Sequence, residues 1–363
     1  MSMLEGIRVL EIADGLTDFG GRMLAELGAE VTVVLPEATQ ELSRERAWHH
    51  GKTRVTADTA EAIRTLAQSV DIILDGQRNG DRFDLSSALN PRTIYIRVTP
   101  FSANGPYAGR PAADLTLFAM SGLMHVTGEP SGPPLKFPGQ QAYALTGIQA
   151  ATAALMGIYA RRSNGKGQTA GLSAFQSTTL ANYREAVMYE WTGRIGRRQG
   201  NLLVRGKSGV RQTWPCKDGY VTWSMIDNPS MMRAVVGVMI ERGAAGELSE
   251  IDWGNILVAD TAQETIERWQ SVFADFFAAH TRDELGQWSL ERGWGLSVIM
   301  APDDVRNSEH LAVRGLFVTV TDEATGDAYR VPGPLFHSAV MDAPARSLKK
   351  PVPASTLAAG AAP

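Results

Sequence analysis

A short apolar run, Ile7-Arg8-Val9-Leu10-Glu11-Ile12, stands near the start of the chain and has the β-branched composition of a strand. After two glycine-containing corners, apolar residues recur at helical spacing over residues 20–27. Gly28 is placed to end that helix, and Val31-Thr32-Val33-Val34 resumes strand character. The segment therefore predicts a strand, a helix and a parallel strand, which is a βαβ unit of the Rossmann type.

The alternation continues beyond this unit. The patterns predict a helix over 59–69, a strand over 71–74, a helix over 85–89 and a strand over 93–98. Such a parallel sheet binds ligands beyond the carboxyl ends of its strands. We therefore expect the corners at 15–21, 76–80 and 99–105 to lie on one ligand-binding face.

The rest of the chain divides into two further parts. Helical periodicity covers 114–123 and 142–162, and 169–183 is typical of a strand followed by a helix. Beyond Arg205 the pattern changes to a hairpin at 214–223 that turns on Asp218-Gly219, then helices, then a second hairpin. The helices are expected at 231–239, 262–280 and 282–291, and the strands of the second hairpin at 316–320 and 329–331.

These patterns predict an α/β fold with a large Rossmann-like domain over 1–205 and a small α+β domain over 206–325. Residues 326–363 would return to the large domain and end in a tail rich in Pro and Ala. We expect that tail, from Ala343, either to be ordered by contact or to be disordered.

Composition excludes several classes of function. The 363 residues are 44% hydrophobic and 20% charged, with a net charge of −4, so no cationic face for nucleic acid or an anionic membrane is expected. Cys216 is the only cysteine, which excludes disulfides within the chain and cysteine-based metal cages. No apolar run is long enough for a signal peptide or a membrane span, and a cytoplasmic location fits best.

Several ordered blocks resemble the family III CoA-transferases, the group that includes formyl-CoA transferases and α-methylacyl-CoA racemases. The first is the opening βαβ segment, and the last, Pro332-Gly333-Pro334, lies near the end of the chain. Between them are Asn90-Pro91-Arg92-Thr93-Ile94-Tyr95, Phe101-Ser102-Ala103-Asn104-Gly105-Pro106-Tyr107, Thr127-Gly128-Glu129-Pro130, Gly165-Lys166-Gly167-Gln168 and His310-Leu311-Ala312-Val313-Arg314-Gly315-Leu316-Phe317. The resemblance implies the fold of that family, in which two ring-like chains interlock as a homodimer, and CoA thioesters as ligands.

One position departs from the family pattern. The family's nucleophilic aspartate stands four residues before a helix glycine, and here Tyr143 stands four residues before Gly147. In the family that carboxylate attacks the thioester to give a mixed anhydride, which a phenol with an ordinary pKa near 10 cannot do at neutral pH. Tyr143 is therefore either a proton and hydrogen-bond donor to the substrate or an aromatic that fills the space of the carboxylate.

His125 is the second candidate catalytic residue. The racemases of the family carry a histidine in a similar setting, and Gly122-Leu123-Met124-His125-Val126-Thr127-Gly128 matches it. An imidazole that titrates near neutrality suits abstraction of the proton α to a thioester. The alternative is a hydrogen-bonded histidine in the core.

Further departures concern the binding of CoA itself. Val33 and Leu35 stand where the family commonly has Lys and Glu, and Asp18 stands where it commonly has Pro. Cations for the CoA phosphates could come from Lys136 or from a basic group formed by Arg44, Arg46, Lys52 and Arg54, although that group is equally typical of a solvated surface.

The expected ligand contacts lie on the loops after the strands and comprise Gly76, Gln77, Arg78, Gly80, Asn104, Gly105 and Lys136. No nicotinamide cofactor is expected, because 15–21 is not a proper dinucleotide fingerprint. No metal is expected either, because His49-His50 and Asp303-Asp304 lack a third ligand at a diagnostic spacing.

Three functions fit these observations. The first is an enzyme of the transferase, racemase, isomerase or lyase type that acts on an acyl-CoA with His125 and Tyr143. The second is a non-catalytic subunit of a heteromeric CoA-transferase, whose partner chain would carry the aspartate. The third is a family member that binds a ligand without CoA, which Val33 and Leu35 suggest.

Overall fold

The computed structural model describes residues 2–36, 42–76, 83–333 and 347–361, and these form two compact units. The first unit comprises 1–125, 135–196 and 309–363, and the second comprises 126–134 and 197–308. The boundaries between the large and the small unit thus fall at 196/197 and 308/309, compared with the 205/206 and 325/326 expected from the sequence.

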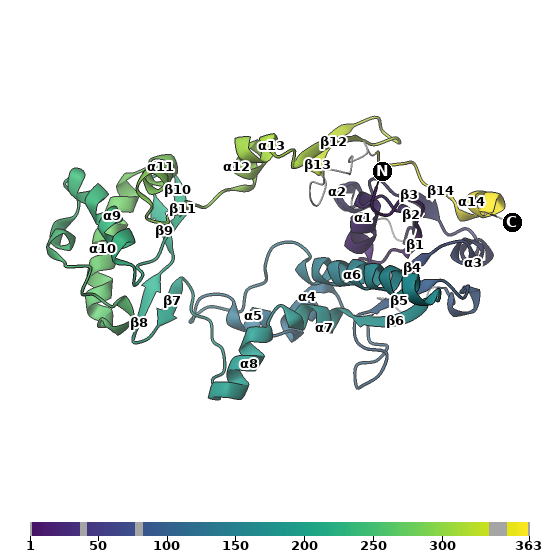
Figure 1. Cartoon of the computed structure of the whole chain (residues 1–363), viewed down its shortest axis with the longest axis horizontal. Coiled ribbons are helices and arrows are strands. Elements are labelled where there is room, and N and C mark those ends of the chain that lie inside the picture. The colour runs from purple at the N-terminus through teal and green to yellow at the C-terminus, as the bar shows by residue number, and fades with distance from the viewer. Residues whose placement is uncertain (1, 37–41, 77–82, 334–346, 362–363) are drawn as a thin grey trace. The chain divides into compact units, whose positions relative to one another are not determined.

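The first unit is built on a seven-stranded sheet with the order β14-β3-β2-β1-β4-β5-β6 (Figure 1). All of its strand pairs are parallel, as the βαβ alternation predicted. The strands are β1 (Arg8–Ile12), β2 (Glu30–Val34), β3 (Thr53–Thr56), β4 (Ile72–Gly76), β5 (Ile94–Thr99), β6 (Gln168–Ser173) and β14 (Val352–Pro353). The predicted α/β fold with a parallel sheet is confirmed.

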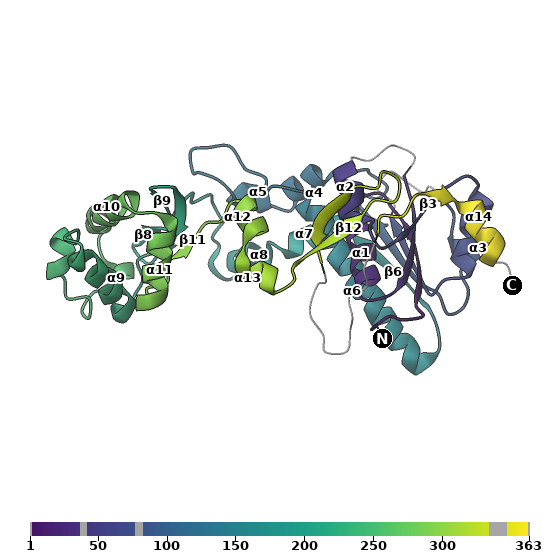
Figure 2. The ribbon, with the colours of Figure 1, turned by 90° about the horizontal axis from the view of Figure 1, so that it is seen from above.

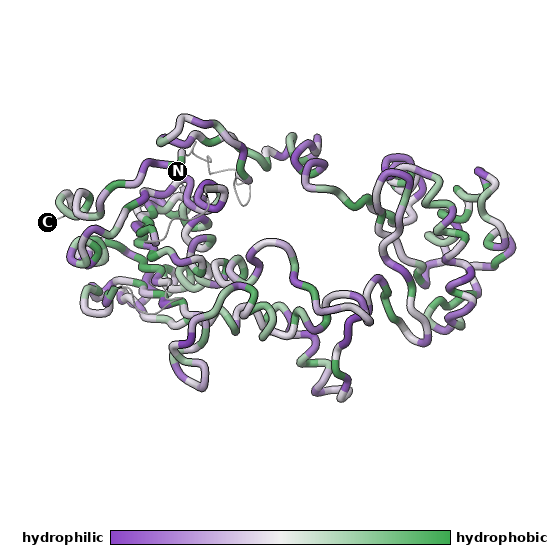
Figure 3. Tube along the Cα trace, turned by 180° about the vertical axis from the view of Figure 1, so that it is seen from behind, coloured by the Kyte–Doolittle hydropathy of each residue, from purple (hydrophilic) through white to green (hydrophobic). Residues whose placement is uncertain are grey.

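Helices cover both faces of this sheet, so its central strands are apolar on both sides. One face packs against α1 (Asp18–Glu26) and α6 (Gln141–Asn164), and the other against α3 (Ala60–Gln68) and α14 (Ala354–Ala361). Figure 2 shows α3 and α14 side by side, and Figure 3 shows the hydrophobic residues along the strands. The sheet therefore holds the core in two separate layers.

Close packing of α1 on α6 depends on glycine. A Cβ added to Gly147 would lie 2.8 Å from the backbone nitrogen of Gly20, and one added to Gly20 would lie 2.7 Å from the Gly147 carbonyl. Further along α6, a Cβ on Gly157 would lie 2.6 Å from the side chain of Ile94 in β5. The Ala- and Gly-rich composition of 142–162 allows this close contact between the helices.

Three features of the first unit differ from expectation. The stretch expected as a helix at 85–89 is a single 3₁₀ turn, η1 (Ser86–Ala88), and β3 and α2 (Leu42–Trp48) were not predicted. The Pro- and Ala-rich tail is ordered over Val352–Ala361, because Val352 pairs with Val55 of β3 and Ala358 packs against α3. The prediction of a disordered tail was wrong for these residues, and the prediction of order by contact is confirmed.

The first unit has further elements outside the sheet and the helices named above. They are α4 (Asp114–Met120), α5 (Leu123–Val126), whose last residue is assigned to the second unit, α7 (Ala174–Leu180), α8 (Tyr183–Thr192), α13 (Glu309–Val313) and the hairpin of β12 (Phe317–Thr321) and β13 (Ala328–Pro332). None of the helices among the described residues has an apolar stretch long enough to cross a bilayer.

The second unit has its own aromatic core. Trp214 and Trp223 pack on Phe273 and Phe277 of α10, and Trp294 is fully buried beside them. The predicted hairpin at Asp218-Gly219 is present as β9 (Thr213–Cys216) and β10 (Gly219–Thr222). The other elements are β7 (Leu202–Arg205), β8 (Ser208–Arg211), α9 (Pro229–Glu241), η2 (Gly246–Glu250), η3 (Val258–Asp260), α10 (Gln263–Ala279), α11 (Arg282–Arg292), β11 (Ser297–Val298) and α12 (Pro302–Asn307).

Candidate functional site

The carboxyl edge of the parallel sheet holds the predicted ligand-binding loops. β1, β4 and β5 end there at Ile12, Gly76 and Thr99. Gly76 lies tightly against the loop after β1, since a Cβ on it would be 2.6 Å from the Asp14 carboxylate and 2.7 Å from the Ile12 carbonyl. Close packing therefore explains why this position is a glycine. The predicted contact of Gly76 with a ligand stays a prediction.

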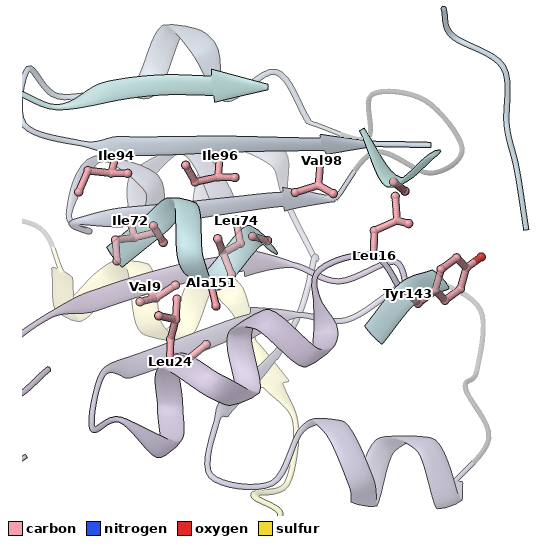
Figure 4. Close-up of a cluster of buried hydrophobic side chains, with 14 of the residues drawn as sticks. Val9, Leu16, Leu24, Ile72, Leu74, Ile94, Ile96, Val98, Tyr143 and Ala151 are labelled. Carbon is pink, nitrogen blue, oxygen red and sulfur yellow. The ribbon is translucent and has the colours of Figure 1, made fainter. Parts of the chain in front are cut away.

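Tyr143 lies in the first turn of α6, beside this edge. It is 4% exposed, and its ring belongs to the apolar cluster on the α1 and α6 side of the sheet. Figure 4 shows the ring next to Leu16 at one end of that cluster, with the hydroxyl pointing away from the aliphatic side chains. The ring of Tyr143 is thus part of the core, while its hydroxyl is a polar group at the tip. This geometry fits both alternatives, a hydrogen-bond donor to the substrate and an aromatic that fills space.

Asp114 links Tyr143 to another predicted residue, Lys136. The backbone N–H of Tyr143 donates to Asp114 Oδ1 at 3.1 Å, and Asp114 Oδ2 lies 3.4 Å from Lys136 Nζ. Lys136 also donates to the carbonyl of Gly139 and remains about one third exposed. Asp114 is buried, so it positions the start of α6 and balances the lysine charge. Asp114 was not among the residues expected from the sequence, because its partners Lys136 and Tyr143 lie 22 and 29 positions away.

His125 lies on α5, a helix of four residues, and is exposed. Its backbone N–H donates to the carbonyl of Gly122, which has a φ of +82°. The alternative reading of His125 as a core histidine is therefore wrong. Its exposed position leaves the imidazole accessible to a ligand, and its catalytic role remains a prediction.

The basic group on and after α2 is tied to carboxylates of the same unit. Lys52 is fully buried and lies 2.6 Å from Glu11, and Arg54 is buried and paired with Glu45. Arg46 binds Asp322 and Asp327 on the hairpin of β12 and β13, and Arg44 lies 3.2 Å from Asp18. The reading of this group as a solvated surface run is therefore wrong for Lys52 and Arg54, and its part in binding the CoA phosphates stays a prediction.

A fully buried polar cluster lies behind this edge. Glu11 of β1, Asp18 at the start of α1 and His49 after α2 are each at most 2% exposed. Gly15 N–H donates to Asp18 Oδ1 at 3.2 Å, and His49 Nε2 lies 3.6 Å from Asp18 Oδ2. No hydrogen-bond partner is present for either ring nitrogen of His49 among the residues that the structure describes. The cluster was missed in the sequence because its members are 7 to 38 positions apart, although the replacement of Pro by Asp18 was visible.

Burial shifts the pKa values of the groups in this cluster. It raises the pKa of Glu11 to about 8, an effect larger than the opposing attraction of Lys52. Burial also disfavours ionised Asp18, but the neighbouring His49 and the charges of Lys52 and Arg44 outweigh it and hold the pKa of Asp18 below its ordinary range. Burial lowers the pKa of His49, which favours the neutral imidazole. Asp18 is therefore the fixed negative charge of the cluster.

The donor atoms of Glu11, Asp18 and His49 lie within 4.8 Å of one another, close enough to share a metal ion. Lys52 and Arg44 already supply positive charge to the two carboxylates, however. A divalent cation would have to displace these internal cations at a cost that the buried ion pairs make high. The cluster is better described as a buried network of hydrogen bonds and charges in which Asp18 carries the fixed negative charge.

The remaining predicted contacts lie on the loop after β5 or outside the described residues. Asn104 and Gly105 are exposed, and Gly105 has a φ of +104° with open space around it. Gln77, Arg78 and Gly80 fall outside the described residues, so their roles stay predictions. The structure thus brings Tyr143 and Lys136 together through Asp114 and places the β5 loop at the same edge of the sheet.

Comparison with known proteins gives one consistent result. The model of CoA-transferase family III matches residues 4–355. The chain is 26% identical to the succinyl-CoA:(R)-benzylsuccinate CoA-transferase subunit BbsE of Thauera aromatica, over 90% of this chain and 86% of that protein. It is 28% identical to a succinate–glutarate CoA-transferase of Agrobacterium fabrum over 65% of this chain and 66% of the relative.

Solved structures show the same fold. A CAIB/BAIF family protein from Brucella suis superposes with a TM-score of 0.82 at 22% identity, covering 99% of this chain and 100% of that one. Rv3272 from Mycobacterium tuberculosis superposes with a TM-score of 0.72 at 21% identity, covering 98% of each chain. Together with the family match over nearly the whole sequence, the parallel sheet and its flanking helices establish that this chain belongs to CoA-transferase family III.

Proposed function

We propose that this chain is an enzyme that acts on a CoA thioester without a carboxylate nucleophile at the usual place. Membership of CoA-transferase family III supports the thioester, and the observation that carries the rest is Tyr143 in the first turn of α6. Two carboxylates at this edge of the sheet are already engaged, Asp114 by the Tyr143 backbone and Lys136, and Asp18 by Arg44 and Gly15. Neither is free to take up an acyl group.

Tyr143 would then act as a hydrogen-bond donor to the thioester carbonyl. A phenol O–H that donates to that oxygen can stabilise the negative charge that develops on it when the carbonyl is attacked. The start of a 24-residue helix adds the positive end of its dipole at the same place. His125 would act as the acid and base at the α-carbon or at the leaving thiolate.

Calorimetric titration with CoA and with acyl-CoA thioesters tests this proposal. The Tyr143→Phe and His125→Gln variants are expected to bind CoA as the unmodified chain does and to lose turnover. Absence of heat with every thioester at millimolar concentration would overturn the proposal. Release of an acyl hydroxamate from the protein by hydroxylamine would also overturn it, because it would show an anhydride on an Asp or Glu of this chain.

The second candidate is a non-catalytic subunit of a heteromeric CoA-transferase. The relative from Thauera aromatica is itself named as a subunit, and a chain that keeps the fold and lacks the carboxylate fits that role. Affinity purification from the native host separates the two functions. An enzyme is expected to be active alone, whereas a partner subunit should copurify with a second family member that carries the aspartate.

The third candidate function, binding of a ligand that lacks CoA, rests on Val33 and Leu35. Both of these residues are buried. Buried apolar residues in β2 and directly after it are explained by core packing, so they give no independent support for that reading.

We also propose that the chain forms a homodimer, in the interlocked arrangement that the family resemblance implies. In the single chain, α8 leaves large apolar side chains exposed: Tyr183, Val187, Tyr189 and Trp191. Contiguous exposed apolar surface of this kind is usually covered by another chain. Light scattering during size exclusion should give twice the mass of the 39.2 kDa chain, and a monomer would contradict the proposal.

A further inference from the structure

Arg44 and Tyr143 meet at Gly15, in the loop between β1 and α1. Gly15 has a φ of +105°, and a Cβ on it would lie 2.6 Å from Arg44 Nη2 and 3.0 Å from Tyr143 Cε2. Only glycine can take this conformation without strain and leave room for both side chains. The guanidinium and the aromatic ring therefore converge on one point at the carboxyl edge of the sheet, where ligands of such sheets bind.

Arg44 keeps unused hydrogen-bonding capacity among the described residues. Its one recorded contact among the described residues is with Asp18 at 3.2 Å, and its Nε is buried without a hydrogen-bond partner. A guanidinium carries five N–H donors in a fixed fork, which suits a carboxylate held by two parallel hydrogen bonds. By contrast, Arg46 makes hydrogen bonds to two carboxylates, from both Nε and Nη2.

Asp18 fixes the direction of this guanidinium. Its carboxylate accepts from the Gly15 N–H and from Arg44, and it faces His49 on a third side. Because Asp18 is itself buried, the ion pair holds Arg44 against the loop with little freedom. Asp18 is thus a positioning residue, and the N–H groups of Arg44 that Asp18 does not engage are left for an anion beside Tyr143.

We propose that Arg44 binds the carboxylate of the acid co-substrate, and that this substrate carboxylate performs the attack that an enzyme aspartate performs elsewhere in the family. The inference rests on the proposed function, because it assumes that the thioester carbonyl binds next to Tyr143. The phosphates of CoA are separated from its thioester by the whole pantetheine arm, so a guanidinium at the reacting end serves the acid rather than those phosphates.

The reaction balances without a covalent enzyme intermediate. An oxygen of the acceptor carboxylate attacks the thioester carbonyl carbon, the C–S bond breaks, and a mixed anhydride of the two acids forms beside CoA thiolate. The thiolate then attacks the acceptor carbonyl carbon of the anhydride and expels the donor acid as its carboxylate. The products are the acceptor thioester and the donor acid, and one oxygen of the acceptor has moved to the donor.

Oxygen labelling in a single turnover tests this route. The probes are short mono- and dicarboxylic acids labelled with ¹⁸O in the carboxylate, each paired with succinyl-CoA, and the enzyme is in excess. The released succinate is expected to carry one ¹⁸O atom. Double-reciprocal plots of the steady-state rates should show intersecting lines, which indicate that both substrates are bound together. Unlabelled succinate in the first turnover, or parallel lines, would overturn the proposal.

Substitution of Arg44 supplies the second test. Because a hydrogen bond to a charged group is worth ~1.5–3 kcal/mol, Arg44→Gln should raise the KM for the acid on the order of ten- to a hundredfold. The Kd for CoA should stay within about twofold, since a single phosphate contact would be worth a similar energy and its loss would be visible. An equal loss of CoA affinity would overturn the proposal, because it would make Arg44 a phosphate ligand.

Two further variants guard against misfolding and against general charge effects. Arg44→Lys keeps a cation opposite Asp18 but loses the planar fork, so it should fold and still raise the KM for the acid. Arg64→Gln removes a surface arginine that pairs with Glu61 on α3 and should change neither constant. If CoA thioesters bind but no acid is converted, this inference fails while the binding part of the proposed function stands. If no thioester binds, the proposed function itself fails.

Discussion

Tyr143 combines local packing with a polar group at its tip. It lies in the first turn of α6, its backbone N–H donates to Asp114, and its ring packs beside Leu16. Under the proposed function, its phenol stands where the family resemblance expects a carboxylate. A phenol O–H can donate a hydrogen bond to a thioester carbonyl, so the proposed order of chemical steps differs although the fold is that of the family.

Tyr143→Asp should restore a covalent route. A carboxylate at this position would stand at the start of α6 and beside Arg44, and both favour its ionised form. We expect incubation with succinyl-CoA to give a mass increase of one succinyl group that hydroxylamine removes. Tyr143→Phe is the matched control and should give no adduct, and an adduct on the unmodified chain would contradict the prediction.

A second prediction for a single residue concerns Glu11 and the pH dependence of stability. Its pKa rises from an ordinary 4.5 to about 8 in the folded chain, so the folded state binds one more proton than the unfolded state between these values. The stabilisation is complete below pH 4.5 and is lost as the pH rises through 8, with a slope of about 1.4 kcal/mol per pH unit. Denaturant unfolding from pH 5 to 7.5 should show this slope in the difference between the unmodified chain and Glu11→Gln, and the difference should level off above pH 8. Parallel profiles would contradict it.

The buried charges were the part of the site that the sequence could not show. Hydropathy treats Lys52 and Arg54 as surface residues, and for that reason β3 was not recognised as a strand. Their burial depends on carboxylates such as Glu11, which is 41 positions away from Lys52. A partner at that distance leaves no local pattern. Tyr143, in contrast, was found because its spacing from Gly147 is local.

At the scale of elements, the contact between α1 and α6 sets the distance between Asp18 and Tyr143. Gly20 and Gly147 bring the two backbones together directly after these residues. Any side chain at the contact would push the helices apart and would separate the loop of Gly15 from the start of α6. The same contact therefore serves stability and the geometry of the site.

Gly147→Ala should destabilise the first unit. Its Cβ would lie 2.8 Å from the Gly20 nitrogen and 2.9 Å from Phe19 Cβ, and overpacking of this kind costs ~1–3 kcal/mol. The control is Gly237→Ala on α9, where nothing lies within 4 Å of the added methyl group. That variant should be stabilised by ~0.5–1 kcal/mol, because alanine is the better helix former. Equal denaturant midpoints for the two variants would contradict the prediction.

The sequence predicted most elements of the sheet and its helices, because their periodicity is local. It did not predict that β14 would be the seventh strand. The register of Val352 on Val55 is set by contact across the whole chain, and two residues carry no strand pattern of their own. Elements that are ordered only by a distant neighbour lie beyond what local patterns can show.

For the whole molecule, the second unit is expected to fold alone. Its buried core comes entirely from 210–296, and the described contacts of 126–134 with it include backbone hydrogen bonds near Gly200. A fragment of 197–308 should unfold cooperatively on heating, as followed by near-UV circular dichroism of its tryptophans. A gradual, non-cooperative change would contradict this, and the complementary pieces of the first unit should not fold separately.

The pairing of β14 with β3 has a consequence for synthesis on the ribosome. Asp58, which follows β3, accepts a hydrogen bond from the backbone N–H of Ser355, which is 297 positions further along the chain. At ~5–20 residues per second, the β3 edge stays open for roughly 15–60 s of translation. During that time a nascent chain offers unpaired backbone groups to other nascent chains, so this protein should depend on chaperones until β14 has emerged.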